Sequence, residues 1–492
     1  MGLSNQLQQG LESLCAAGPV EVMEDGELLA GLSPFQFEVR EQGGRVLLHV
    51  WSAERNLARR VLAVGDSTAH SLAVEVQRFG RSRPGRLEFA LTGRPRTAVR
   101  LTRAMFRTRF GHILAEQFPD EEIEALTSSP DLEHSFSGSY TRGLMRRGQR
   151  AWAVMAASPS ESMATVDAML SYALLWLDWN RRRPRRGTVA GLRLFLPARA
   201  GRLTAHRLQA LDTSTAIELY ELDLDARRVP RVDPQDIGNL ETWLTPLREA
   251  DETLAAAKAD IERITSLAPE GIDATVPPGT REVSLRFRGV EFARWQNGMV
   301  EFGLGDHRKP LTSRNADQLS RLVARLRKYR HHGAARTGHE LYRAHAERWL
   351  ESMLLADATA LDAALDPRFL YSQVPAFSAG DRGVIDLLGL TRSGRTVVVE
   401  LKAQEDLSLA LQAVDYWLRV RWHLERGDFE RYGYFRGMKL APHLPMLWLV
   451  APGLRYHPAT EVILRYLNPQ IEVTRFGLNE TWRAGLQVIF RQ

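Results

Sequence analysis

The chain has 492 residues, of which 44% are hydrophobic and 25% charged, so its composition is globular and excludes wholesale disorder. Lysine and arginine outnumber aspartate and glutamate by 65 to 59, which weakly favours an anionic partner such as nucleic acid. The single cysteine, Cys15, excludes an internal disulfide framework, and no run approaches the roughly 18 apolar residues of a membrane span. The first residues lack a signal-peptide pattern, so we expect a cytoplasmic protein. Because 492 residues exceed the size of one ordinary core, we also expect two to four domains.

The first 103 residues predict a β-rich module. Residues 35–40 and 45–51 alternate apolar and polar side chains around Gly43-Gly44, which is the pattern of a β-hairpin. Two more alternating segments, 71–77 and 86–91, predict further strands.

The middle of the chain predicts an α/β domain, a linker and a second β-hairpin module. In the α/β domain, 104–230, we expect helices over 105–118 and 165–179 and strands over 139–145, 150–157, 192–197 and 216–222. Residues 231–279 have helical periodicity with mixed charge and predict a helical linker. Residues 280–338 predict a hairpin with an Asn297-Gly298 turn, followed by a helix. The fold class is therefore α/β and α+β, with several domains.

The last domain, 339–492, carries the residues that suggest chemistry. One apolar strand holds Asp386, and after a turn a second strand runs through three valines to Glu400-Leu401-Lys402. Side chains alternate along a strand, so Glu400 and Lys402 project from one face, which Asp386 can reach across the hairpin. Two carboxylates are costly among valines unless a cation accompanies them. Mg²⁺ prefers carboxylate oxygens, waters and phosphate as ligands, so the pattern predicts a metal site.

These motifs resemble a known family. The G-x-x-D strand, the strand that ends in E-L-K, and Q-x-x-x-Y on the next helix resemble the PD-(D/E)xK nuclease superfamily. The resemblance is strongest to its RecB-type branch, and it extends to the C-terminal domain of mismatch-specific endonucleases. It covers roughly residues 340–452. It implies a restriction-endonuclease-like αβββαβ core and a deoxyribonuclease that depends on Mg²⁺ or Mn²⁺.

The resemblance also implies a role for each residue of the motif. Asp386 and Glu400 are expected to hold the metal, and Lys402 is expected to serve the nucleophilic water. Gln412 and Tyr416, one helical turn apart, are expected to support the site and to contact the substrate backbone.

Further site residues are expected on two helices. The family places a glutamate on a helix before the first strand, and both Glu347 and Glu351 fit, because they lie one turn apart on one face. Further along the helix that carries Gln412 and Tyr416, Arg419 or Arg421 is a candidate for lining the substrate channel, with packing of the helix against the sheet as the alternative.

The order of predicted elements suggests an internal duplication with an offset of about 245 to 255 residues. Residues 104–230 would be a degenerate copy of the nuclease-like core. Where the second half has VVVELKA, the first has AWAVMAA, with Val154 and Ala156 in place of the acid and the lysine. Such a copy is expected to be catalytically inactive.

The leading hypothesis is a metal-dependent nuclease that hydrolyses DNA in repair, recombination or defence against foreign DNA. DNA and RNA are not distinguished. The alternative is a non-catalytic nucleic-acid-binding or scaffold protein with a nuclease-like fold. A homodimer and a motor or ATPase partner also stay open, since the chain carries no G-x-x-x-x-G-K-[ST] motif of its own.

Overall fold

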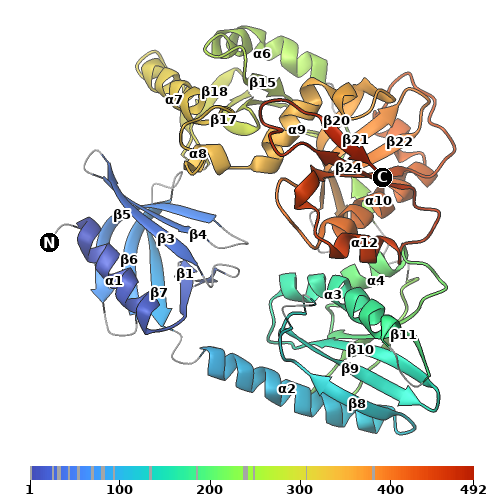
Figure 1. Ribbon diagram of the computed structural model, residues 1–492. Coiled ribbons are helices and arrows are strands. Elements are labelled where there is room, and N and C mark those ends of the chain that lie inside the picture. The colour runs from blue at the N-terminus through green and yellow to red at the C-terminus, as the bar shows by residue number, and fades with distance from the viewer. Residues whose placement is uncertain are drawn as a thin grey trace.

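The computed structural model of the chain contains several α/β and β units (Figure 1). It describes residues 3–24, 27–29, 35–42, 45–51, 56–67, 71–78, 84–91, 95–131, 134, 136–183, 187–236, 242–247, 250–305, 307–378 and 383–492. Four sheets occur in these ranges. None of the helices they contain is long and apolar enough to cross a membrane.

The N-terminal module is an antiparallel sheet with one helix against it. Its elements are α1 (Leu3–Ala17), β1 (Val20–Glu24), β2 (Glu27–Leu28), β3 (Gln36–Gln42), β4 (Arg45–Trp51), β5 (Asn56–Ser67), β6 (Ser71–Arg78) and β7 (Gly85–Leu91), with strand order β2-β1-β7-β6-β5-β4-β3. The predicted hairpin is β3 paired with β4, and its Gly43-Gly44 turn lies outside the described residues. Helix α1, which was not predicted, buries Leu7, Leu11 and Leu14 at helical spacing.

A first α/β unit follows. It contains α2 (Pro95–Gln117), β8 (Glu122–Thr127), β9 (Tyr140–Arg147), β10 (Arg150–Ala157), α3 (Met163–Arg182), β11 (Thr188–Pro197), α4 (Arg202–Leu208), β12 (Ala216–Leu222) and β13 (Arg231–Val232). The sheet order is β13-β12-β11-β10-β9-β8. Helix α3 covers one face through residues such as Leu170 and Leu174, and α2 covers the other through Phe110 and Leu114. Figure 1 shows α2 running from the N-terminal module to this unit.

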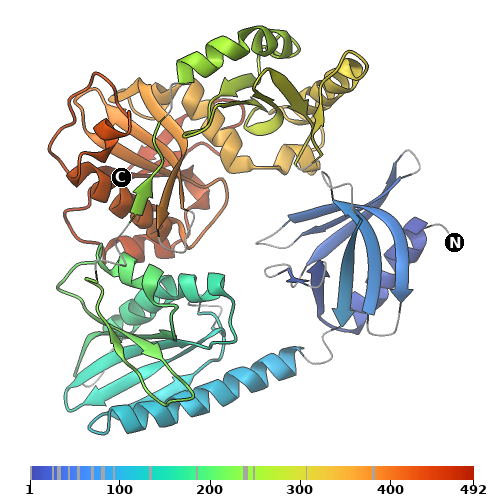
Figure 2. The same cartoon turned by 180° about the vertical axis from the view of Figure 1, so that it is seen from behind.

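The segment predicted as a helical linker also contains strands of two sheets. Its elements are β14 (Thr242–Leu244), α6 (Ala250–Thr265) and β15 (Ile272–Thr275). Strand β15 begins a five-stranded sheet with β16 (Glu282–Phe287), β17 (Val290–Gln296), β18 (Met299–Phe302) and β19 (Lys309–Pro310), followed by α7 (Ala316–Tyr329). Strand β14 pairs instead with the sheet of the last unit, at whose edge it lies in green in Figure 2. Periodicity alone could not reveal this pairing, because three residues form too short a pattern.

The last unit holds the predicted site. Its elements are α8 (Glu340–Arg343), α9 (Ala346–Ala356), β20 (Leu365–Ser378), β21 (Val384–Thr391), β22 (Thr396–Leu401), α10 (Leu409–Glu425), α11 (Asp428–Arg431), β23 (Met446–Pro452), α12 (Ala459–Leu464), β24 (Val473–Leu478) and β25 (Val488–Arg491). The sheet order is β14-β20-β21-β22-β23-β24-β25. The run α9–β20–β21–β22–α10–β23 has the αβββαβ order that the resemblance implies, and membership of the superfamily stays a prediction.

The two α/β units share one sheet topology. In the first, neighbours from β8 to β13 are antiparallel, antiparallel, parallel, parallel and antiparallel. From β20 to β25 the sequence of directions is the same. The two β-modules do not match in this way, because in the described ranges the N-terminal sheet has seven strands and the later one has five.

The two α/β units pack together through helices. Helix α3 contacts α12, and α10 contacts α4, so one hydrophobic cluster runs through both units. At its centre Arg207 of α4 and Asp415 of α10 form an ion pair at 2.8 Å, with both side chains buried. The helical faces of the two sheets therefore cover each other.

Candidate active site

The site begins at the β21–β22 hairpin, which is buried on both faces. Val397 and Val399 pack against Trp349 on the α9 side, while Val398 packs against the α10 side. Coverage on both faces explains why this strand is a nearly continuous apolar run. Leu387 pairs with Val399, so the next residues outward, Asp386 and Glu400, face each other across the hairpin.

Asp386 is held by the backbone and by a glutamine from the neighbouring strand. Its Oδ2 accepts a hydrogen bond from the Leu401 amide at 3.1 Å. Nε2 of Gln373 on β20 lies 3.4 Å from Oδ1 of Asp386 and donates to Oε2 of Glu351 at 2.7 Å. Gln373 thus links a carboxylate of the sheet with one of helix α9. The sequence motif did not point to Gln373.

The backbone at Gln373 explains how this side chain reaches both carboxylates. Its φ is 54°, in the left-handed region that non-glycine residues rarely adopt. It lies between two paired stretches of β20, since Ser372 pairs with Leu387 and Val374 with Ile385. A strained residue of this kind is typical of positions where side-chain placement matters more than local stability.

Lys402 connects the strand to helix α10. Its Nζ lies 3.4 Å from Oε1 of Glu400 and 3.6 Å from Oδ2 of Asp406, and it donates to Oε1 of Gln412 at 2.9 Å. Nε2 of Gln412 donates to the Tyr416 hydroxyl at 3.3 Å. The two helical residues therefore extend the network that begins at the catalytic candidate Lys402.

Both candidate glutamates of α9 reach this region, in different ways. Glu351 is 2% exposed and, besides Gln373, contacts Arg348 at 3.0 Å and Arg286 at 3.6 Å. Glu347 accepts a hydrogen bond from the Ala403 amide at 3.4 Å. Glu351 is the one that Gln373 links to Asp386.

Burial shifts the protonation of all three carboxyl groups. Desolvation raises the pKa of Glu351 to about 7. It raises the pKa of Asp386, and it raises that of Glu400 well above its usual range, with the charge of Asp386 adding to the effect. Burial alone would lower the pKa of Lys402, but the neighbouring carboxylates, Glu400 first, raise it. Lys402 therefore carries a positive charge. This single charge does not offset the cost of burying the neighbouring carboxylates.

The donor set fits a hard divalent cation. Glu400 is fully buried, and neither of its oxygens accepts a hydrogen bond from any described residue. A cation shared with Asp386 would satisfy those oxygens and reverse the pKa shifts. No group of three or more His, Cys, Asp or Glu side chains within the described ranges is placed to hold a metal, so the remaining ligands would be waters and substrate.

Arg419 requires a correction. It was a candidate for the substrate channel, but it is 1% exposed and donates to the carbonyl oxygen of Ala376 on β20. A Cβ at Gly383 would collide with the end of the Arg419 side chain, so a larger residue there would displace the guanidinium. Arg419 therefore supports the sheet from inside the core, which is the helix-packing alternative.

The first α/β unit has different residues at the corresponding positions. In the first unit, Met155 pairs with Leu194, which lies three residues before the proline that ends β11. In the second unit, Glu400 pairs with Leu449, which likewise lies three residues before the proline that ends β23. Met155 and Ala157 therefore correspond to Glu400 and Lys402. The sequence comparison, which placed Val154 and Ala156 there, was one residue out of register.

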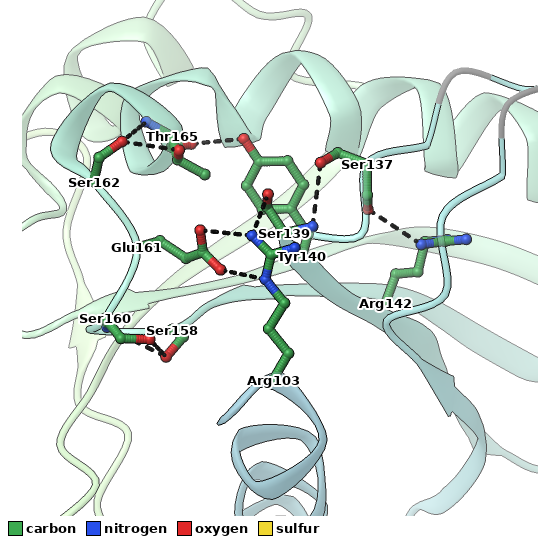
Figure 3. Close-up of polar contacts among 10 residues, drawn as sticks. All are labelled: Arg103, Ser137, Ser139, Tyr140, Arg142, Ser158, Ser160, Glu161, Ser162 and Thr165. Atoms are coloured by element: carbon green, nitrogen blue, oxygen red, sulfur yellow. Dashed lines mark hydrogen bonds and ion pairs between the residues drawn. The ribbon is translucent and has the colours of Figure 1, made fainter. Parts of the chain in front are cut away.

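The strand that corresponds to β21 carries an arginine at the equivalent place. Arg142 pairs with Met155 and so corresponds to Asp386. Its guanidinium is buried, donates to the carbonyl oxygen of Ser129 at 2.7 Å and lies 5.0 Å from the Phe136 ring centroid. Figure 3 shows Arg142 directed toward Ser137. The guanidinium group of Arg142, held by these contacts, thus lies at the position where the other unit has the carboxylate of Asp386.

Polar contacts in the first unit tie its helices together. Arg103 of α2 reaches between Glu161, at 2.7 Å, and the Ser139 hydroxyl, at 2.9 Å (Figure 3). The Tyr140 hydroxyl donates to the carbonyl oxygen of Thr165 at 2.6 Å. Hydrogen bonds of this kind position α2 and α3 on the sheet. They do not form an acidic site, since the sequences of strands β9 and β10 contain no aspartate or glutamate.

Comparisons with known proteins give no family. No protein-family model matches the chain. No curated protein matches it either. Among solved structures, Can2 from Sulfobacillus thermosulfidooxidans, in complex with cyclic tetra-adenylate, aligns at 10% identity and a TM-score of 0.16, over 66% of this chain and 93% of that chain. At that TM-score the alignment does not establish a common fold.

Proposed function

We propose that the chain is a Mg²⁺- or Mn²⁺-dependent nuclease that hydrolyses DNA phosphodiester bonds, with Asp386, Glu400 and Lys402 as its catalytic residues. The observation that carries the proposal is the fully buried Glu400, whose oxygens accept no hydrogen bond from the described part of the chain, beside Asp386 and the ammonium group of Lys402, 3.4 Å away. A cation and a phosphate are the two species that this arrangement suits.

The residues divide the work of hydrolysis between them. Asp386 and Glu400 would hold the metal, which when bound lowers the pKa of a water and stabilises charge on the phosphate. Lys402, hydrogen-bonded to Gln412, orients the attacking water and offers positive charge to the phosphate. Gln373 keeps Glu351 next to Asp386, so the negative potential at the metal position is maintained.

A substrate would reach the site from the side of Asp386 and Lys402. Both are partly exposed, whereas Glu400 and Glu351 are buried behind them. A substrate phosphate would therefore meet Asp386 and Lys402 first, while the buried glutamates act from behind them. The wider role in repair, recombination or defence is part of the same proposal.

The test is metal-dependent cleavage of plasmid, single-stranded DNA and RNA. Wild-type protein is compared with Asp386→Asn and Lys402→Met, each checked for folding by thermal denaturation. Cleavage that requires Mg²⁺ or Mn²⁺ and is lost in both variants is expected. Equal activity in wild type and variants would disprove the assignment, and the choice of nucleic acid identifies the substrate.

A second candidate is a non-catalytic nucleic-acid-binding or scaffold protein. The burial of Glu400 beside Lys402 favours it, because a structural ion pair would have the same contacts. It predicts salt-dependent binding to DNA without products in any metal. The cleavage assay above, with a binding measurement in parallel, separates the two.

A further inference from the structure

The two α/β units are arranged as a pair with reciprocal contacts. Helices α3 and α10 occupy the same place in the two topologies, and so do α4 and α12. Helix α3 contacts α12, while α10 contacts α4. Each unit therefore contacts the other through the same two helices, with the longer helix of one unit against the shorter helix of the other. Such an exchange is what a two-fold axis produces.

The backbone meets at the centre of this pair. Leu211 and Leu467 form an isolated antiparallel bridge, and each is the third residue after the end of its helix, α4 or α12. The Asp212 amide donates to the carbonyl oxygen of Tyr466 at 2.9 Å, and the Asn468 amide donates to that of Ala210 at 2.8 Å. Corresponding residues therefore pair with each other, as they do across the axis of a symmetric dimer.

An ion pair also joins the shorter helix region of each unit to the longer helix of the other, although the two pairs lie at positions that do not correspond. Arg207 of α4 binds Asp415 of α10, and Arg465, which follows α12, lies 3.4 Å from Asp178 of α3. Both units thus offer an arginine at the end of the shorter helix to an aspartate on the longer helix. The chain thus contains, within itself, two similar units paired about an approximate two-fold axis.

Only one member of the pair has the acids. Asp386, Glu400 and Lys402 of the second unit correspond to Arg142, Met155 and Ala157 of the first. The two strands of duplex DNA are related by local two-fold symmetry, and a symmetric protein places one unit on each strand. We propose that the chain binds duplex DNA as a built-in dimer and cuts one strand only, leaving a nick; this rests on the proposed nuclease function.

The experiment is a time course on closed circular supercoiled plasmid with Mg²⁺ and the full-length protein. The expected first product is the open circle, which accumulates while the supercoiled form is lost, and linear DNA follows only from independent nicks. On an oligonucleotide duplex labelled on both strands, each molecule is cut in one strand. Light scattering at the assay concentration is expected to give one chain of 55.5 kDa.

Variants locate the cut. Asp386→Asn is expected to abolish nicking. Met155→Leu conserves volume at the position that corresponds to Glu400, so it is expected to leave nicking unchanged. Residual nicking in Asp386→Asn would show chemistry in the first unit, and loss of nicking in a folded Met155→Leu protein would show that cleavage depends on the first unit's strand; either result would overturn the inference.

The outcomes separate this inference from the proposed function. Linear DNA as the first product would overturn the single-strand cut but keep the nuclease. Cleavage of single-stranded DNA with untouched duplex would overturn the duplex substrate in the same way. No product from any nucleic acid in either metal would overturn both.

Discussion

Nζ of Lys402 and Oε1 of Gln412 lie 2.9 Å apart, so the amide of the helix accepts a hydrogen bond from the ammonium group on the strand. Gln412 is in turn within 3.3 Å of the Tyr416 hydroxyl. This chain of contacts explains why a glutamine and a tyrosine one helical turn apart belong with a lysine ten residues before the glutamine.

Replacing Gln412 tests whether it positions the lysine. Gln412→Ala removes the acceptor that fixes Nζ, so the cleavage rate is expected to fall about 10- to 100-fold with a smaller change in KM. Gln412→Glu restores an acceptor and should recover part of kcat. Gln296→Ala, at an exposed position on β17, is the matched control. If Gln412→Ala left kcat unchanged, the hydrogen bond would have no role in the reaction.

Glu351 predicts a pH dependence of stability. Its pKa is raised to about 7 in the folded protein because it is buried, against a usual value of 4.5. The folded state therefore binds the proton more tightly than the unfolded state, and stability is expected to fall as pH rises from about 4.5 to 7. The full effect is at most ~3 kcal/mol.

Glu351→Gln stays neutral and should lack this loss. In metal-free buffer its melting temperature is expected to exceed that of wild type at pH 8 and to approach it at pH 5, as measured by calorimetry. Asp357→Asn, which alters a carboxyl outside the core, serves as the control. A difference between wild type and Glu351→Gln that does not change with pH would contradict the assigned pKa.

Local patterns along the chain predicted the hairpin of the site well. The turn at Ser393-Gly394, the valine strand and the helix with Gln412 are determined by neighbouring residues, and the structure has all of them. The position of Glu351 on a helix before β20 was also anticipated, because helical spacing limits the choice to two residues.

Contacts between distant segments could not be predicted in the same way. Gln373 belongs to no motif, and its role depends on a left-handed backbone that only the sheet imposes. The sequence left open whether Arg419 lines a channel or packs against the sheet, and only the fold shows that its guanidinium donates to the carbonyl oxygen of Ala376. The pairing of Met155 with Arg142 depends on hairpin loop lengths, which differ between the two units. Alignment of the two strand sequences therefore placed the corresponding positions one residue away.

Gln373 allows side chain and backbone to be tested separately. Gln373→Gly and Gln373→Val both remove the amide between Glu351 and Asp386, so both are expected to lose activity to a similar extent. Glycine accepts the φ of 54° at this position, whereas a β-branched residue does not. The valine variant should therefore be less stable than the glycine variant by roughly 1–2 kcal/mol in urea denaturation. Equal stabilities would show that the left-handed backbone at this position carries no strain.

The buried ion pair between the two α/β units gives the last prediction. Arg207 contacts Asp415 through Nε and Nη2 at 2.8 to 3.1 Å, and both side chains are buried. Asp415→Ala leaves an arginine without this counter-charge in the core, so we expect a loss of about 3–5 kcal/mol of unfolding free energy. Replacing both residues, as in the double variant Arg207→Met and Asp415→Leu, also removes the buried guanidinium charge and should restore most of that loss.

A matched ion pair on the surface supplies the control for this prediction. Arg465 lies 3.4 Å from Asp178 across the same interface but is 50% exposed, so Arg465→Ala is expected to cost no more than about 1 kcal/mol. Urea denaturation of the four proteins, followed by fluorescence of the buried tryptophans, measures all of these differences. If Asp415→Ala were no more destabilising than Arg465→Ala, the contact between Arg207 and Asp415 would not hold the two units together, and the pair would depend on its apolar helices alone.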